Sequence, residues 1–198
     1  MYLYGASGHA KVIIDILQST GLSVSGLFDD NPDLKELCGI KVLGKFKLGQ
    51  DLQEPLIISI GNNRIRARIA QQLPVKYGQA ISKTAILSPS ATVGEGTVVM
   101  QGAILQAEAQ VGRHVIINTG ATVDHDCLIG DFAHVSPGAV LCGNVSVGEG
   151  TWIGAGAVVI PGVKIGKWCQ IGAGAVVIRD IPDNAVAVGN PSKIIKYC

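Results

Sequence analysis

Aliphatic residues recur at every sixth position through the carboxyl-terminal half of the chain, from Leu87 to Val177. A small or β-branched residue, or a cysteine, follows each of the first fifteen members four positions later. A period of six fits neither a 3.6-residue helix nor a simple alternating strand. It is typical of a parallel β-helix, in which three hexapeptides form one triangular coil and both residues of each pair point inward. The members of the series are Leu87, Val93, Val99, Leu105, Val111, Ile117, Val123, Ile129, Val135, Leu141, Val147, Ile153, Val159, Ile165, Ile171 and Val177.

Glycine often follows the aliphatic residue directly, and we expect it there because tight corners need backbone angles that glycine adopts easily. Five coils stacked at about 4.8 Å would form a column about 24 Å tall. The positions concerned are Gly94, Gly112, Gly130, Gly148, Gly154, Gly166 and Gly172.

Residues 1–80 do not follow the six-residue step and instead alternate short apolar runs, glycine-containing turns and amphipathic stretches. This order predicts a small Rossmann-like α/β domain over residues 1–80, with a parallel sheet, followed by a β-helix domain over residues 81–198. The expected elements are a strand at Met1–Tyr4, a helix that buries Val12, Ile13, Ile16 and Leu17 and ends at Gly21, strands at Val24–Phe28 and Leu56–Ile60, and a helix at Arg64–Leu73.

Three turns follow the predicted strands, at Gly5–His9, Asp29–Asn31 and Gly61–Asn63. Ligands of parallel sheets bind at the carboxyl ends of the strands, so these turns predict a nucleotide pocket. The helix that begins after Gly8 can bind phosphate through its backbone N–H groups. The Asp29–Asp30 pair can accept hydrogen bonds from a ribose or a base. The first turn lacks GxGxxG spacing, and the alternatives are a structural turn and a solvated acidic turn.

The composition narrows the class of protein. Charged residues make up 16% of the 198, aromatic residues 5%, and the net charge is +1, which argues against a nucleic-acid surface. The five cysteines are odd in number and show no CxxC spacing, and Cys127 and Cys169 fall on inward positions of the repeat. A reducing, cytoplasmic compartment is the default for such a pattern. We expect neither a signal peptide nor a membrane span.

Candidate chemistry centres on the four histidines. His125 lies two residues after an inward aliphatic, at an outward corner, and Asp126 can orient its ring and raise its basicity, as a general base requires. His134 lies nine residues later, half a coil away, so the two rings could share a cleft only across an interface between subunits. No acidic residue follows His114, which we expect to be structural. A surface histidine without a role is the alternative for each.

Two other chemistries are less favoured. A zinc site would need three converging imidazoles, as in β-helix carbonic anhydrases, whose His-x4-His pair is missing here. Covalent catalysis by cysteine is disfavoured because the cysteines of the histidine-rich segment point inward. We therefore expect no metal.

The residues also carry a family resemblance that extends over nearly the whole chain. The segments YGASGHAK, FDD, IGNNRIR, NTGATVDHDCLIGDFAHVSPGA and VGNPSK closely resemble hexapeptide-repeat sugar acetyltransferases of the sialic-acid O-acetyltransferase-like type. The best match is to bacterial UDP-4-amino-sugar N-acetyltransferases of the bacillosamine type. The resemblance implies a left-handed β-helix and a homotrimer that binds acetyl-CoA in the grooves between neighbouring columns.

The resemblance also implies site residues. His125 matches the general base, and Asp126 stands where the family often has glutamate. The positions that match contacts to acetyl-CoA are Asn118, His134, Gly143, Ala155 and Ala173. Those that match the pocket for the uridine nucleotide are Ser7, Gly8, His9, Asp29, Asp30 and Gly61.

These observations predict an acetyl-CoA-dependent N-acetyltransferase that acts on a UDP-linked 4-amino-4,6-dideoxy sugar in the cytoplasm. Its expected small-molecule partners are acetyl-CoA and the UDP-linked amino sugar, and no nucleic acid is expected to bind. Two alternatives stay open: O-acetylation of a sialic acid or another sugar hydroxyl, and a non-catalytic β-helix that binds a nucleotide-sugar or organises a complex.

Overall fold

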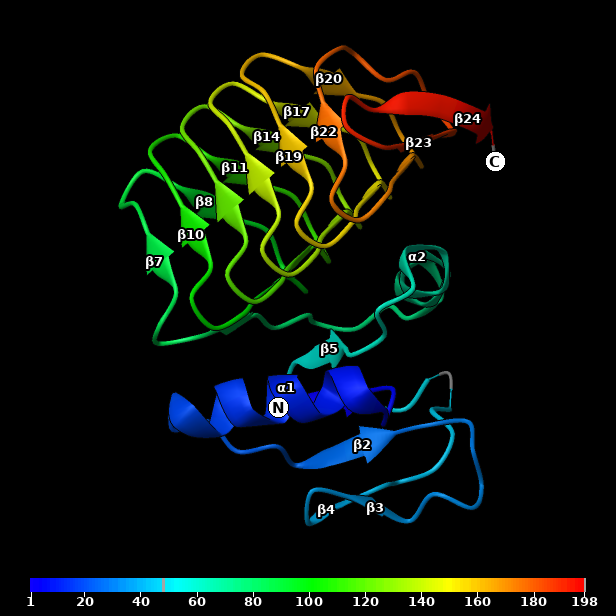
Figure 1. Ribbon diagram of the computed structural model, residues 1–198. Coiled ribbons are helices and arrows are strands. Elements are labelled where there is room, and N and C mark those ends of the chain that lie inside the picture. Colours follow the sequence, from blue (N-terminus) through cyan, green and yellow to red (C-terminus); the bar gives the residue numbers. More distant parts are fainter. Residues whose placement is uncertain (48, 198) are drawn as a thin grey trace.

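The computed structural model describes residues 1–47 and 49–197, so Cys198 lies outside the described residues. A small α/β unit at the amino terminus packs against one side of a column of stacked coils (Figure 1). The chain enters the column at β6 (Ala80–Ile81), which pairs with β9 one coil later. The domain boundary at residue 80 stays a prediction.

The amino-terminal unit contains a three-stranded parallel sheet in the order β2-β1-β5, formed by β1 (Tyr2–Tyr4), β2 (Gly26–Phe28) and β5 (Leu56–Ile58). The predicted strands that became β2 and β5 are shorter than expected, because each pairs only with the three residues of β1. The two helices, α1 (Gly8–Ser19) and α2 (Asn63–Gln72), cover opposite faces of this sheet.

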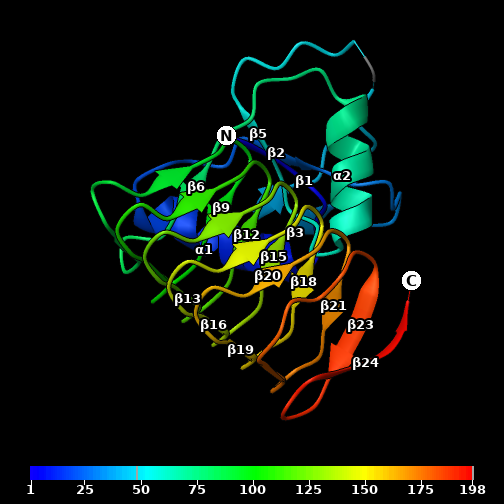
Figure 2. The same cartoon turned by 90° about the horizontal axis from the view of Figure 1, so that it is seen from above.

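The apolar face of α1 joins the unit to the column. Ile13 and Leu17 are fully buried in a cluster that also contains Val98, Met100 and Ile116 of the column. Figure 2 shows α1 passing under the strands that carry these residues. The helix ends as predicted at Gly21, whose φ of 82° turns the chain so that the Leu22 N–H bonds to the Leu17 carbonyl.

A short hairpin, β3 (Glu36–Leu37) and β4 (Ile40–Lys41), was missed by the sequence analysis. Cys38 and Gly39 form its turn with φ values of 53° and 75°, which is the left-handed pair that two-residue hairpins prefer. Strands of two residues are too short to show an alternating pattern, so they could not be predicted from the periodicity of apolar residues.

Three parallel sheets form the faces of the column. Face 1 consists of β7 (Ile86–Leu87), β10 (Ile104–Leu105), β13 (Thr122–Val123), β16 (Val140–Leu141), β19 (Val158–Val159) and β22 (Val176–Val177). Face 2 consists of β8 (Thr92–Val93), β11 (Gln110–Val111), β14 (Leu128–Ile129), β17 (Ser146–Val147) and β20 (Lys164–Ile165). Face 3 consists of β6, β9 (Val98–Val99), β12 (Ile116–Ile117), β15 (His134–Val135), β18 (Trp152–Ile153), β21 (Gln170–Ile171), β23 (Ala185–Val188) and β24 (Lys193–Tyr197).

The inward positions are those that the repeat predicts. Every member of the aliphatic series from Val99 to Val177 is at most 4% exposed, and Leu87 and Val93 of the first coil are partly buried. Burying one such side chain contributes about 1.5–3 kcal/mol relative to leaving it exposed. A continuous aliphatic core therefore runs through the stacked coils, and each coil is stabilised by packing against the adjacent coils.

The explanation offered for the repeat glycines was wrong. Gly94, Gly148 and Gly154 do not have positive φ. A Cβ at these positions would lie 2.5–2.6 Å from backbone atoms of the next coil, so glycine is required there for close stacking. The left-handed residue of each corner lies two positions later, as at Gly96 and Gly156.

The last strand of the column runs against the others. β24 pairs antiparallel with β23 and ends the sheet of face 3 (Figure 1). Neither of the two described helices combines the length and the apolar character needed to cross a membrane.

Candidate active site

His125 lies at the corner between faces 1 and 2, here named the His125 corner. The ring is exposed, and its Nδ1 lies 2.7 Å from Oδ2 of Asp126. Asp126 has a φ of 60°, and the Asp124 carboxylate accepts the His125 N–H at 2.8 Å. The hydrogen bond with Asp126, and next the charge of Asp124, raise the pKa of His125. Because a carboxylate accepts, Nδ1 carries the proton and Nε2 is the free basic nitrogen.

Gly143 lies under this imidazole, one coil further along the column. A Cβ on Gly143 would lie 2.5 Å from the Nε2 atom of His125. Glycine therefore leaves the space that the ring occupies. The resemblance implies a contact between Gly143 and acetyl-CoA, and that role stays a prediction.

A second polar cluster lies along the opposite edge of face 1, at the corner between faces 3 and 1, here named the Asn118 corner. His134 projects from β15, and its Nε2 lies 3.0 Å from Nδ2 of Asn118. Ala155 and Ala173 are exposed at the same corner, one and two coils above the turn at Ser136–Gly138. The Asn118 corner thus carries four of the residues predicted to contact acetyl-CoA, namely Asn118, His134, Ala155 and Ala173. The fifth, Gly143, lies beside His125 at the other edge of face 1.

The environment of His134 differs from that of His125. Burial, followed by the positive charge of Arg66 and the proximity of His9, lowers the pKa of His134 to about 3. A hydrogen bond with the Gly61 backbone acts in the opposite direction. His134 is therefore neutral at pH 7 and acts as a hydrogen-bonding group whose protonation state does not change near neutrality.

Arg66 of α2 joins this cluster to the column. Its side chain is 1% exposed, and it donates hydrogen bonds to the carbonyls of His114, Phe132 and Ile60 at 2.8–2.9 Å. No carboxylate within the described residues pairs with it, and burial lowers its pKa to about 9, so it stays charged at pH 7. Arg66 was not predicted to be a functional residue, and it fixes the turn before α2 against the coils.

Two of the three loops that were predicted to bind a nucleotide line the same pocket. A pocket of about 360 Å³ at the carboxyl ends of β1, β2 and β5 is lined by Gly5, Asp29, Asp30 and Arg68, among other residues. Asp29 already accepts the N–H groups of Ala6 and Asn31 at 2.8 and 2.9 Å, so it shapes the loop after β1. Asp30 is exposed and available to a ligand.

The remaining predicted nucleotide residues lie outside the walls of this pocket. Ser7 and Gly8 are exposed at the first turn of α1. His9 is largely buried, its Nε2 has no hydrogen-bond partner, and burial and the charge of Arg66 lower its pKa to about 4. Gly61 lines the neighbouring pocket.

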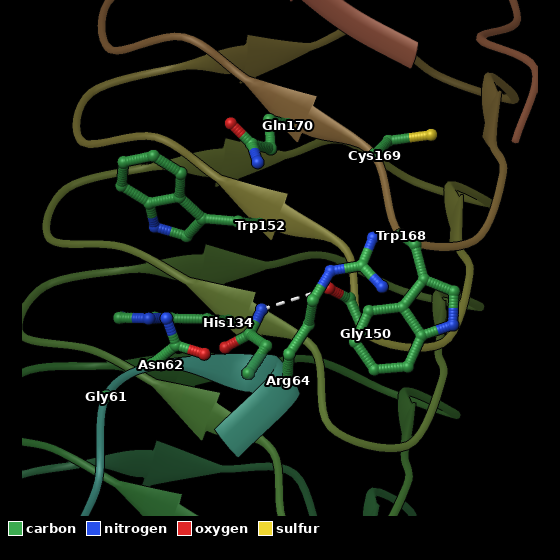
Figure 3. A pocket seen from close by; sticks show the side chains of 10 residues that line it. Gly61, Asn62, Arg64, His134, Gly150, Trp152, Trp168, Cys169 and Gln170 are labelled. Atoms are coloured by element: carbon green, nitrogen blue, oxygen red, sulfur yellow. Dashed lines mark hydrogen bonds between the residues drawn. The ribbon is translucent and has the colours of Figure 1, made fainter. Parts of the chain in front are cut away.

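That neighbouring pocket was not predicted. It measures about 380 Å³ and lies between the amino-terminal turn of α2 and face 3 of the column (Figure 3). Its walls include Gly61, Arg64, His134, Trp152 and Trp168. Neither tryptophan could be assigned to a pocket from the repeat alone, because the walls form only when α2 docks on the column.

The other predictions about histidine and cysteine are settled by packing. His114 is 4% exposed, stacks on Phe132 with ring centroids 5.3 Å apart, and is structural as expected. Cys127 and Cys169 are buried in the column core as predicted, and burial raises the pKa of both thiols. Within residues 1–47 and 49–197, no group of three His, Cys, Asp or Glu side chains is placed to hold a metal ion.

Face 1 connects the two polar corners. Its outward side chains are mostly aliphatic and incompletely buried, and Ile86 is 64% exposed. Face 2 presents a mixture of polar and apolar side chains instead. The outward residues of face 1 are Ile86, Ile104, Thr122, Val140, Val158 and Val176.

Comparison with known proteins identifies both parts of the chain. Residues 1–73 match the PglD N-terminal domain, and residues 144–179 match the bacterial transferase hexapeptide (six repeats). An uncharacterized protein of Acanthamoeba polyphaga mimivirus is 37% identical over 98 residues, or 48% of this chain, and the match spans 20% of that protein.

Solved structures match almost the whole chain. A histidine-to-asparagine variant of perosamine N-acetyltransferase from Caulobacter crescentus, in complex with CoA and GDP-perosamine, is 39% identical, with a TM-score of 0.91 over 98% of this chain and 96% of that one. The acetyltransferase domain of PglB from Neisseria gonorrhoeae is 38% identical, with a TM-score of 0.92 over 98% of both chains. These matches confirm the expected left-handed β-helix behind a small α/β domain. The chain belongs to the acetyl-CoA-dependent, hexapeptide-repeat sugar N-acetyltransferases that carry a PglD-type amino-terminal domain.

Proposed function

We propose that the chain transfers the acetyl group of acetyl-CoA to the 4-amino group of a UDP-linked 4-amino-4,6-dideoxy sugar. One observation carries the proposal: an exposed His125–Asp126 pair lies at one edge of an aliphatic face, and the Asn118–His134 pair lies at the other edge. The first pair has the features of a general base. The second is a neutral hydrogen-bonding pair beside the nucleotide-binding unit.

A homotrimer would bring the two edges together. An aliphatic face that stays partly exposed on one chain is expected to be covered by other copies. If face 1 of three copies packs around a threefold axis, the His125 corner of each copy adjoins the Asn118 corner of the next. Acetyl-CoA would then lie in the groove between two columns, along the edge of Asn118, Ala155 and Ala173.

The chemistry follows from these positions. The neutral amine of the sugar attacks the thioester carbonyl carbon, and Nε2 of His125 accepts a proton from the amine nitrogen. The carbon–sulfur bond then breaks, the amide forms, and the imidazolium returns the proton to the CoA sulfur. Proximity accounts for much of the acceleration, and a positioned base typically adds about 10²–10⁴-fold. Asp126 holds the ring in the tautomer that this step needs.

The nucleotide would bind in the pocket that Asp30 and Arg68 line, at the carboxyl ends of the sheet. Uridine is our proposal from the resemblance. The Caulobacter crescentus relative binds GDP-perosamine, so guanine is the competing base.

An acceptor screen tests this function. Release of free thiol from acetyl-CoA is measured with UDP-, GDP-, dTDP- and CDP-linked 4-amino sugars, and the acetylated atom is located by NMR. We expect turnover with a UDP-linked 4-amino sugar and an amide at C4. Turnover with GDP-perosamine alone would correct the base, and an ester product would replace N-acetylation by O-acetylation. Absence of both turnover and CoA binding would contradict the proposal and support a binding scaffold.

A further inference from the structure

The pocket between α2 and face 3 combines aromatic and polar side chains. Trp152 lines this pocket and is 43% exposed, and its indole N–H donates to the Ser136 hydroxyl at 2.7 Å, so its polar atom is already satisfied. Polar groups of His134 and Gln170 line the same space. Ligand pockets typically combine apolar and aromatic walls with a few polar groups in a volume of about 300–1,000 Å³.

Trp168 forms another wall, at the corner between faces 2 and 3. The Arg64 guanidinium lies over its ring, 4.8 Å from the ring centroid. Figure 3 shows Trp152 and Trp168 on opposite sides of the pocket, with Arg64 on the side of Trp168. The amide of Asn63 donates to the Gly150 carbonyl at 3.1 Å and holds the first turn of α2 against the column. The pocket is therefore built from two parts of the molecule that are fixed to each other.

This pocket and the nucleotide pocket adjoin at the turn between β5 and α2. Ile60 and Ile65 line the nucleotide pocket, whereas Gly61 and Arg64 line the pocket with the tryptophans. A single elongated ligand that lies across the first turn of α2 can therefore reach both pockets.

The charges at this crossing fit a nucleoside diphosphate with an attached sugar. Arg64 lines one pocket and Arg68 lines the other, four residues apart on α2 and thus on the same side of the helix. Neither arginine makes an ion pair within the described residues. Two such cations are complementary to a diphosphate that joins a nucleoside on one side to a sugar on the other.

We propose that the pocket with Trp152, Trp168 and Gln170 binds the pyranose ring of the acceptor, and that Trp152 determines which sugars are accepted. This inference rests on the proposed function, because it names where that acceptor places its sugar. The deoxygenated C6 methyl group and the C–H face of the ring would contact the indole of Trp152. The amine would point toward the Asn118 corner, past His134.

Binding of paired ligands tests the assignment. Calorimetry compares the UDP-linked 4-amino sugar with UDP, and GDP-perosamine with GDP, on the wild type, Trp152→Ala, Trp152→Phe and Tyr197→Ala. Tyr197 is the matched control, an aromatic residue that is 62% exposed on β24 and outside both pockets. Circular dichroism melting checks that each variant is folded.

We expect Trp152→Ala to raise the Kd of the nucleotide-sugar by about tenfold or more, while the Kd of the free nucleoside diphosphate changes by less than about twofold. Trp152→Phe should recover most of the loss, and Tyr197→Ala should behave as the wild type. Equal weakening of both ligands, an unchanged Kd for both, or a raised KM for acetyl-CoA alone would overturn the assignment. If the wild type binds the nucleotide-sugar with this signature but transfers no acetyl group, the pocket stands and the proposed function fails.

Discussion

His125 and His134 lie in the same coil, yet the fold gives them opposite properties. His125 is exposed at a corner, bonded to Asp126, and has a raised pKa. His134 is enclosed between face 3 and α2, bonded to Asn118, and has a pKa lowered to about 3. The difference comes from the neighbours of each ring: carboxylates stabilise one imidazolium, and burial beside Arg66 destabilises the other.

The comparison separates two tasks. A group that accepts a proton during turnover must be exposed and basic, and the hydrogen bond with Asp126 and the charge of Asp124 raise the pKa of the exposed His125. A group that only positions a ligand benefits from a fixed charge state, and His134 has one because its lowered pKa keeps the ring neutral at pH 7. His125 lies at one edge of face 1, whereas His134 lies on face 3 beyond the other edge. One chain therefore does not bring the two rings together, and a shared site needs a second copy.

Removing the exposed imidazole should have the largest effect. We expect His125→Ala to lower kcat by at least about 100-fold, because the amine loses its proton acceptor. Acetyl-CoA should still bind, which calorimetry can measure. Near-normal turnover would rule out His125 as the base.

Displacing the same imidazole without removing it should have a smaller effect. The added methyl group of Gly143→Ala would overlap Nε2 of His125, and an exposed ring can turn away at little cost in stability. A misplacement of about 1 Å can cost about 10²-fold in rate. We expect kcat to fall by about tenfold, because the exposed ring can return part of the time to its reactive position, with an unchanged melting temperature. Gly143 does not have a positive φ, so the added methyl group strains no left-handed backbone. A Gly143→Ala enzyme with wild-type kcat would show that ring position is not critical.

The smallest change should be in the pH profile. Asp126 raises the pKa of His125, so Asp126→Asn should lower that pKa, and the neutral base should persist to lower pH. The acidic limb of kcat/KM should therefore shift to lower pH, with a modest fall in the plateau because the ring is less well oriented. A limb that stays in place, or moves to higher pH, would show that another group controls it. His114→Gln, which changes a buried ring, should leave the limb unmoved.

The features that could be predicted from the sequence are those set by residues that lie close together along the chain. The inward residues follow from the six-residue period, and the His125–Asp126 pair follows from adjacent positions at a corner. The role of Arg66 could not be predicted, because Arg64, Arg66 and Arg68 alternate on one helix and only docking shows which one is buried against column carbonyls. The wall that Trp152 forms depends on the same docking.

The most direct test of the shared site is complementation between two variant chains, each of which lacks one of the two imidazoles and is first shown to have low activity alone. His125→Ala and His134→Ala chains are unfolded together, refolded as mixed oligomers, and assayed with the acceptor that the screen selects. If each site takes His125 from one copy and His134 from the next, an equal mixture should recover up to about a quarter of wild-type activity, because one random neighbour pair in four is intact. Mixed oligomers with no more activity than the separate variants would contradict a site formed between copies.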